Sequence, residues 1–409
     1  MFGTVKPNSS RADQAQQDRP GAVVIGANYR ALGVVRSLGR HGIPVWVLRQ
    51  EDELLATTSR YALHHLAWPT SDESEGIDFL IELGAKYGLQ GWMLFPTGDE
   101  STALVARHHT LLGQHFRLTT LPWDVLRWVH DKRLLYRLAQ RLAIDCPWTF
   151  CPHTCADLAA LDCSFPVILK PAMKEGFNRF IAAKAWRVDD RRSLLARYNQ
   201  ACGLVTPELL MVQELVPGGG EGQLSYAALC QDGRPLASVV ARRTRQYPMD
   251  FGRASTFVET VDEPGIVEPA VRLLATLRFT GLVEVEFKQD PRDGRYKLLD
   301  VNPRIWGWIS LGGRAGVDFP YLLWLLIRGE AVPGVRGAIG VKWMRMSTDL
   351  PIAVQEMLRG RLSLLTYARS FRGPHESAIF APDDPLPGLL ELPLMAYLIG
   401  RRLCRGSGI

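Results

Sequence analysis

Four polar side chains on two neighbouring β-rich segments have the types and spacing of a magnesium site. Glu284 and Glu286 alternate with apolar residues in one segment, and Asp300 and Asn302 do so in the next. Because side chains two residues apart in a strand share a face, all four can converge on one volume. Buried carboxylates repel one another unless a cation compensates them, and hard oxygen ligands select Mg²⁺ or Mn²⁺. The alternative, a solvent-exposed strand face, fits the apolar context poorly.

Two lysines are placed where a polyphosphate could meet them. Lys132 opens a helical pattern, and Lys170 ends the apolar segment 165–169. A lysine at the end of a buried strand needs a partner for its ammonium group. Phosphate is one such partner. For either lysine alone, the alternative is a side chain whose stem packs on the surface while its head reaches water.

A turn with three consecutive glycines follows the apolar segment 211–216 and leads into Glu221. The free backbone groups of such a hinge can bind an adenine edge, and a nearby acid can hold ribose hydroxyls. A β-hairpin with a flexible turn is the alternative, since glycine-rich turns alone are weak signals.

The elements that must position these residues predict more than one domain, since 409 residues exceed one compact core. A strand–turn–helix–strand pattern over 22–48 predicts a βαβ unit and a parallel sheet. Apolar spacing predicts a helix over 131–142. The predicted units are a flexible tail (1–20), an open α/β domain (21–125), a two-lobed domain (126–335) with its small lobe at about 145–215, and a C-terminal module of unreadable role (336–409).

Taken in order, these segments resemble the ATP-grasp superfamily over residues 21–330, and within it the bacterial carboxylate–amine ligases that include the D-aspartate ligases. The resemblance implies an α/β and α+β fold in which an open parallel domain precedes two lobes enclosing ATP. The segments that carry it are Asp131-Lys132, Phe165 to Pro171, Gln213 to Glu221, Glu286-Phe287, Asp300 to Arg304, Arg242 to Pro248 and Asn302 to Gly307.

The resemblance also implies a role for each matching residue. Lys132 and Lys170 would hold ATP phosphates, Gln213, Glu214 and Val216 would line the adenine, and Glu221 would take the ribose; Glu286, Asp300 and Asn302 would bind the magnesium ions, and Arg304 would face the reacting phosphoryl group. Arg242, Arg243, Arg245 and Arg304 are candidates for holding the carboxylate or acyl phosphate, although a solvated strand end stays open for the first three. Two features depart from the family pattern: Asp300 stands where glutamate is common, and loop 172–178 has fewer glycines.

The expected activity is an ATP-dependent ligation of a carboxylate to an amine. A small carboxylate attacks the γ-phosphate to give an acyl phosphate and ADP, and an amine, expected to be an amino acid, then displaces phosphate. Two alternatives stay open. One is a ligase that uses a thiol or another nucleophile, and the other is a nucleotide-binding protein without turnover, against which the intact set Glu286, Asp300 and Asn302 argues.

A dinucleotide-dependent oxidoreductase is disfavoured. The loop after strand 22–25 has only Gly26 and Gly33 of the three fingerprint glycines, at the wrong spacing, and no acid follows Leu48 directly. The first domain is therefore expected to bind no NAD or FAD. We expect it to form one wall of the substrate site, with Asp99 and Glu100 near the amine.

Composition narrows the class further. The net charge of +6 and pI near 9.0 are mildly basic, but no basic block alternates with aromatic residues, which disfavours nucleic acid. The polar residues 1–20 lack the apolar core of a secretory signal, so we expect a cytoplasmic protein with reduced thiols. Cys146, Cys151, Cys155 and Cys163 cluster around His153, but their spacing fits no familiar zinc pattern.

The segment Leu386 to Gly400 is the most apolar stretch near the C-terminus, and Arg401, Arg402 and Arg405 follow it. It is too short and too often interrupted to span a bilayer. A helix on a membrane surface is one interpretation. A helix packed on the body or on a second subunit, as in a homodimer, is the favoured one.

Overall fold

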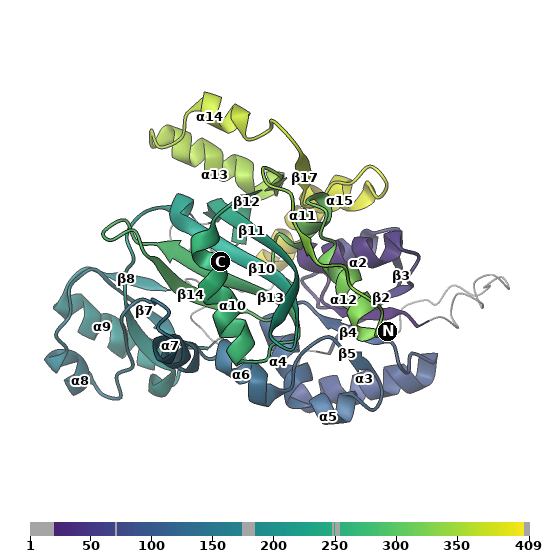
Figure 1. Ribbon diagram of the computed structural model, residues 1–409, viewed down its shortest axis with the longest axis horizontal. Helices are drawn as coiled ribbons and strands as arrows, with labels where there is room; N and C mark the ends of the chain where they lie inside the picture. Colours follow the sequence, from purple (N-terminus) through teal and green to yellow (C-terminus); the bar gives the residue numbers. More distant parts are fainter. Residues whose placement is uncertain (1–19, 70–71, 174–184, 248, 250–253, 405–409) are drawn as a thin grey trace.

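The computed structural model describes residues 20–69, 72–173, 185–247, 249 and 254–404, and these form three β-sheets with helices between them (Figure 1). The predicted tail, apart from Pro20, lies outside the described residues.

The first sheet is parallel, as the βαβ pattern predicts, with strand order β3-β2-β1-β4-β5. Strands β1, β2 and β4 are almost wholly buried because their apolar runs are covered on both faces. After β4, two helices meet at His108. The elements are β1 (Ala22–Ile25), α2 (Tyr29–Arg40), β2 (Val45–Arg49), β3 (Ala62–Ala67), α3 (Glu73–Tyr87), β4 (Met93–Pro96), α4 (Asp99–Arg107), α5 (His109–Leu112) and β5 (Arg117–Leu118).

Close packing explains Gly26, in the β1–α2 turn, and Gly33, within α2. Gly26 has a φ of +115°, and a Cβ there would lie 2.3 Å from Oγ1 of Thr97. A Cβ on Gly33 would lie 2.7 Å from Cγ2 of Ile309, so Gly33 lets α2 approach the large sheet's helices. At the start of α2, the Glu53 carboxylate accepts hydrogen bonds from the Ala27 backbone N–H (2.8 Å) and from the Asn28 side chain. The Glu53 carboxylate therefore occupies the N-terminus of α2, a position at which a helix can bind phosphate.

The second sheet is antiparallel, has the order β6-β9-β7-β8, and forms the small lobe with its own apolar core. Two helices precede it, and Asp131 caps the second by accepting a hydrogen bond from the backbone N–H of Arg133. The elements are α6 (Trp123–His130), α7 (Lys132–Arg141), β6 (Thr149–Phe150), α8 (Cys155–Ala160), β7 (Val167–Pro171), β8 (Trp186–Val188), α9 (Arg191–Cys202) and β9 (Leu210–Glu214). The strand predicted over 181–188 is described only from residue 185.

The third sheet has eight strands in the order β14-β13-β10-β11-β12-β16-β17, with β15 paired to β11. Two helices after β14 are separated by a turn at Gly316, whose φ is +87°. The first domain and this sheet share one apolar core. The elements are β10 (Gln223–Gln231), β11 (Arg234–Tyr247), β12 (Ala254–Thr260), α10 (Val267–Thr276), β13 (Gly281–Gln289), β14 (Tyr296–Asn302), α11 (Ile309–Arg314), α12 (Phe319–Ile327) and β15 (Val335–Arg336).

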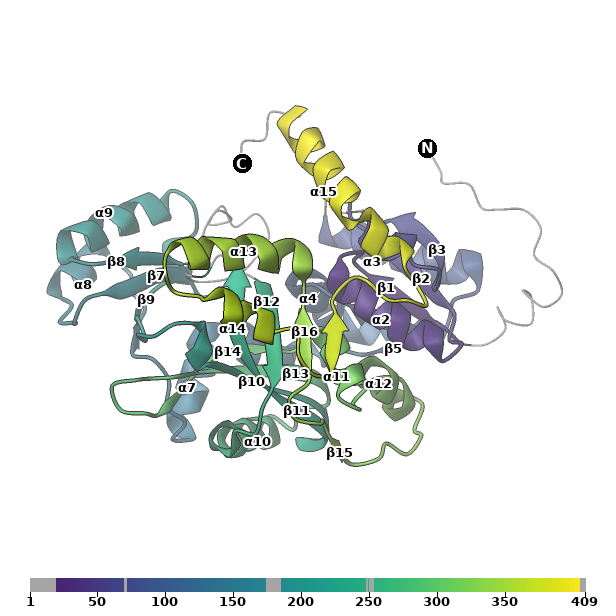
Figure 2. The ribbon, with the colours of Figure 1, turned by 90° about the horizontal axis from the view of Figure 1, so that it is seen from above.

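The C-terminal module is continuous with the large sheet, because two of its strands extend that sheet beyond β12. Figure 1 shows α13 and α14 at the top of the molecule, and Figure 2 shows α15 projecting away from the body. Within the described residues, no helix has both the length and the apolar character needed to cross a membrane. The elements are β16 (Lys342–Met344), α13 (Met346–Leu358), α14 (Leu364–Arg369), β17 (His375–Ser377) and α15 (Leu386–Cys404).

Candidate active site

A cleft of about 1140 Å³ lies between the small lobe, the large sheet and the first domain. That volume can hold a nucleotide together with a small substrate. The structure brings most of the predicted site residues to its wall: Lys132, Lys170, Gln213, Glu214, Val216, Arg243, Glu286, Asp300 and Asn302. Glu221 and Arg304 are not part of the wall, and their positions are described below.

The predicted metal ligands come from two paired strands. Glu286 on β13 is opposite Asp300 on β14, and one step along the ladder Glu284 is opposite Asn302. The Asn302 Nδ2 donates hydrogen bonds to Glu286 Oε1 (2.7 Å) and to Glu284 Oε2 (3.0 Å). Glu286, Asp300 and Asn302 therefore lie together on the two paired strands, as the period-two pattern predicts, with the Asn302 amide nitrogen directed at Glu286.

Glu284 does not join these ligands at the cleft, contrary to the expectation that three carboxylates converge there. Its side chain is buried, and it accepts hydrogen bonds from Ser225 Oγ and Trp308 Nε1, both at 2.9 Å, as well as from Asn302. Burial, with a contribution from Glu286, raises the pKa of Glu284. The three donors direct the carboxylate into the core, so Glu284 orients the Asn302 amide.

Cations of the chain itself compensate the acids in the cleft. The Lys132 Nζ lies 2.7 Å from Asp300 Oδ1, and an Arg243 nitrogen lies 2.5 Å from Glu286 Oε2. Burial alone would lower the pKa of Arg243, but the nearby Glu286 and Glu284 outweigh it and raise the pKa. Within the described part of the chain, no three His, Cys, Asp or Glu side chains form a metal site. The oxygen donors Glu286, Asp300 and Asn302 fit Mg²⁺, which commonly completes its shell with water and substrate phosphate.

Arg304, which follows β14, connects the large sheet to the first domain. Its Nε and NH2 donate to the two carboxylate oxygens of Asp99 (2.6 and 3.1 Å), and NH2 also donates to Asn302 Oδ1 (3.1 Å). Asp99 begins α4 and lines the cleft. The first domain therefore contributes a wall through Asp99, whereas Glu100 is exposed and is not a lining residue.

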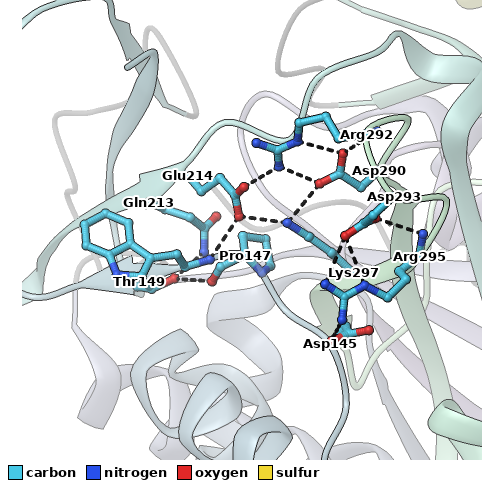
Figure 3. A network of polar contacts seen from close by, with 11 residues as sticks. Asp145, Pro147, Thr149, Gln213, Glu214, Asp290, Arg292, Asp293, Arg295 and Lys297 are labelled. Atoms are coloured by element: carbon cyan, nitrogen blue, oxygen red, sulfur yellow. Dashed lines mark hydrogen bonds and ion pairs between the residues drawn. The ribbon is translucent and has the colours of Figure 1, made fainter. Parts of the chain in front are cut away.

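The hinge is held by a network of charges (Figure 3). Glu214 accepts hydrogen bonds from Lys297 Nζ (2.9 Å), from Arg292 and from the Trp148 backbone N–H (3.2 Å). Burial opposes ionisation of Glu214, but the bonds from Lys297 and Arg292 outweigh it and lower the pKa. Gln213 is buried and donates to Thr149 Oγ1 (2.7 Å).

Lys288 is a cleft residue that the sequence reasoning missed. Its Nζ donates to the backbone carbonyls of Val216 (3.0 Å) and Gly218 (2.7 Å), so it fixes the hinge backbone. The signal was present, because Lys288 continues the period-two series of Glu284 and Glu286.

Two other predicted residues belong to a neighbouring cavity of about 630 Å³. Glu221 lines this cavity and accepts a hydrogen bond from the Gly219 backbone N–H (3.2 Å). Arg245 lines it as well and forms two hydrogen bonds to Asp349 of α13, at 2.9 and 2.8 Å. The expectation that Arg245 holds substrate is therefore wrong in position, because a carboxylate far along the sequence binds its guanidinium outside the cleft.

Lys170 lies at the end of β7 and lines the cleft, as predicted. The loop after it was expected to close over phosphates, but its residues from 174 onward lie outside the described part of the chain. The clustered Cys146, Cys151, Cys155 and Cys163 have free thiols. Burial raises the pKa of Cys146 to about 11.

Comparisons with known proteins agree with this architecture. A family model described as ATP-grasp in the biosynthetic pathway with Ter operon matches residues 207–346. The D-aspartate ligase of Enterococcus faecium (strain Aus0004) is 22% identical over 227 residues, which are 52% of this chain and 53% of that ligase. The match therefore spans about half the length of the curated relative.

Two solved structures share the fold across most of the chain. The L-amino acid ligase of Bacillus licheniformis has 16% identity and a TM-score of 0.59, covering 75% of this chain and 73% of that one. The biotin carboxylase domain of the Hydrogenobacter thermophilus 2-oxoglutarate carboxylase, crystallised with MgADP, ADP and bicarbonate, has 14% identity and a TM-score of 0.62, covering 78% and 73%. The chain has the ATP-grasp fold, and the resemblance seen in the sequence is confirmed.

Proposed function

We propose that this protein is an ATP-dependent ligase that joins a small carboxylate to an amine through an acyl phosphate. The observation that carries the proposal is the arrangement of Lys132, Arg243 and Arg304 around the oxygen donors Glu286, Asp300 and Asn302. Phosphoryl transfer requires such a combination of cations and metal-binding oxygens. The names of two relatives, a D-aspartate ligase and an L-amino acid ligase, support this chemistry.

The nucleotide would lie along the cleft with its adenine at the hinge and its phosphates at the metal-binding strands. Gln213, Glu214 and Val216 line the hinge end, and Lys170 lines the wall contributed by the small lobe. Glu286, Asp300 and Asn302 would hold Mg²⁺, which when bound neutralises charge on the phosphate oxygens. The carboxylate partners of Lys132 and Arg243 would then be taken over by the metal, which leaves both cations to face phosphate.

The chain's own role in the reaction is to position the reactants and neutralise charge. A substrate carboxylate oxygen would bond to the γ-phosphorus while the bond to the β–γ bridging oxygen breaks and ADP leaves. Arg243 and Arg304, both largely buried, would stabilise the anionic reactants. The amine nitrogen would then attack the acyl carbon, lose a proton and displace inorganic phosphate.

The test begins with ADP release measured across a panel of amino acids and small carboxylic acids. We expect Mg²⁺-dependent ADP and phosphate to appear only when an acid and an amine are both present. Hydroxylamine should trap the activated acid as a hydroxamate. A thiol that outcompetes every amine as acceptor would favour the alternative ligase, and ATP binding without turnover across the panel would favour a nucleotide-binding protein.

The intermediate is tested by isotope transfer. An oxygen-18 label in the substrate carboxylate should appear in the released phosphate, because the carboxylate oxygen bonds to phosphorus and leaves with it. AMP and pyrophosphate among the products, or label retained wholly in the organic product, would contradict the acyl phosphate.

A further inference from the structure

Exposed apolar side chains are concentrated in one part of this molecule. Among the described residues, the large exposed hydrophobics outside the C-terminal module are scattered: Leu63, Leu111, Trp148 and Tyr247. Within the module they are dense: Met346, Leu350, Val354, Leu358, Leu364, Leu365, Phe371, Phe380, Leu386, Leu389, Leu392, Tyr397 and Ile399. Scattered apolar residues are ordinary on a protein surface, but a contiguous group marks an interaction site.

Helix α15 carries apolar residues on both of its sides. One side packs on the body through Pro387 and Glu391, which are buried. At 3.6 residues per turn, Leu389 falls on the opposite side and Leu392 and Ile399 fall on its flank; these residues are 65%, 66% and 52% exposed. A surface helix normally turns polar residues toward water. The outward side of α15 is therefore apolar, as a binding surface is.

Helix α13 adjoins this face. Glu391 of α15 accepts hydrogen bonds from Arg345 Nε (3.1 Å) and Ser347 Oγ (2.6 Å), at the start of α13. Farther along α13, Leu350, Val354 and Leu358 are spaced four residues apart and are exposed. Helices α13 and α15 are therefore joined by hydrogen bonds near the start of α13, and α14 adds the exposed Leu364 and Leu365.

The charges of the same module are segregated by sign. Four of its acids, Asp349, Glu356, Asp384 and Glu391, are buried, Glu376 is partly buried, and the more exposed Asp383 is bound by Arg40 and Tyr61. Its exposed charged residues are arginines, namely Arg336, Arg359, Arg361, Arg369 and Arg372, of which Arg359 and Arg361 pair with the buried Glu356. Leucine-rich stripes beside arginine, with the acids withdrawn, match the chemistry of an anionic lipid surface.

We propose that the outward face of α13, α14 and α15 docks on an anionic phospholipid bilayer, in the plane of the interface. Two copies of this chain meeting through the same face would bring their arginines together, and like charges across an interface oppose association. A bilayer instead offers acyl chains for the leucines and phosphates for the arginines. Since the face lies outside the cleft, the proposal stands or falls independently of the ligase chemistry.

The experiment is vesicle flotation of the full-length protein with phosphatidylglycerol vesicles and, in parallel, pure phosphatidylcholine vesicles. We expect binding to phosphatidylglycerol at low salt, at least about 10-fold weaker binding to phosphatidylcholine, and weakening at 0.5 M salt, because surface charges are screened. The double variant Leu389→Glu/Leu392→Glu should lose at least about 10-fold in binding, since it places charge in the apolar stripe.

Two further variants make the result specific. Leu63→Glu alters an exposed leucine of similar exposure on β3, and it should bind vesicles like the unchanged protein. Arg369→Gln/Arg372→Gln keeps the apolar stripes and should weaken binding to phosphatidylglycerol by at least about 5-fold. Because all these side chains are exposed, circular dichroism should confirm unchanged folding.

Three results would overturn the proposal. One is failure of the unchanged protein to float with phosphatidylglycerol vesicles. Another is equal binding by the Leu389→Glu/Leu392→Glu and Leu63→Glu variants. The third is a dimer in light scattering that the Leu389→Glu/Leu392→Glu change converts to a monomer without any effect on vesicle binding, which would assign the face to a second copy of this chain.

Discussion

The cleft and the junction between the first domain and the C-terminal segment both bury acids against basic side chains. In the junction, Asp384 accepts hydrogen bonds from Arg36 Nε (2.9 Å), Ser59 Oγ (2.7 Å) and the Arg60 backbone N–H (2.9 Å). The side chains of Arg36 and Asp384 are 6% and 1% exposed. In the cleft, Lys132 and Asp300 pair at a similar distance, but their side chains remain 16% and 14% exposed and line an open volume.

We infer from this difference that the ion pairs of the junction stabilise the fold, whereas those of the cleft can exchange for a ligand. Asp384 faces three donors from the first domain and has no room for another partner, so its bonds persist. The cleft pairs can exchange, because a metal ion can replace Lys132 at Asp300 while phosphate replaces Asp300 at Lys132. Substitutions in the two regions should therefore have opposite effects on stability and turnover.

The largest effect is expected for Asp300→Asn or Glu286→Gln. Removing a metal-binding carboxylate should cost about 4 kcal/mol of transition-state stabilisation, or about 1000-fold in Mg²⁺-dependent turnover. The melting temperature should stay within a few degrees, because one buried like charge is also removed. ADP release and calorimetry on the same preparations measure both. Unchanged rates in either variant would exclude that residue from the metal site.

Asp384→Asn should show the reverse pattern. Breaking a buried ion pair leaves the Arg36 charge uncompensated, which should lower the free energy of unfolding by about 3 kcal/mol. Turnover measured well below the melting temperature should change less than about 2-fold. The neighbouring Asp383 is a matched control, because it pairs with Arg40 at the surface and its side chain is 41% exposed. Asp383→Asn should lower the free energy of unfolding by about 1 kcal/mol or less. Equal losses of stability in the two variants would contradict the distinction between buried and exposed ion pairs.

The sequence predicted the elements whose signals are local. The alternation around Glu286 and Asp300 predicted β13 and β14, and the apolar spacing over 131–142 predicted α7. The sequence did not predict side-chain positions that are set by partners distant in the sequence. Glu284 is directed into the core by Trp308 and Ser225, and Arg245 is bound by Asp349, more than a hundred residues away. No periodicity encodes such contacts, because they depend on how the strands of the large sheet are ordered.

Glu376, on β17 in the junction, gives that region a dependence on pH. Burial raises the pKa of Glu376 to about 7, although Arg40, Arg36 and Arg314 oppose the shift. The folded protein therefore holds this proton more tightly than the unfolded chain, so stability should fall as pH rises from about 5 to about 8. Allowing for partial exposure, the loss should be about 2 kcal/mol.

Glu376→Gln tests this dependence, because it removes the titrating group and keeps the shape. The variant and the unchanged protein should be equally stable near pH 5, and the variant should be the more stable of the two at pH 8. Urea unfolding midpoints at pH 5, 6, 7 and 8 provide the measurement. Parallel pH profiles for the two proteins would show that Glu376 ionises at its ordinary pKa and that the junction compensates it fully.

The smallest effect is expected at Lys170, which belongs to the cleft but comes from the small lobe. Lys170→Ala should weaken ATP binding or turnover by at least about 10-fold, or about 1.4 kcal/mol, because one charge-assisted contact to phosphate is lost. Lys170→Arg should recover part of the loss, since the charge is kept. Lys86→Ala, on α3 and remote from the cleft, is the control for removing a surface lysine. If both nucleotide affinity and rate are unchanged in Lys170→Ala, its ammonium group only reaches solvent, and phosphate binding then rests on the cations of the large-sheet wall. If only Lys170→Ala is impaired, the small lobe takes part in binding the phosphates, and the exchange of partners proposed for Lys132 extends to both walls of the cleft.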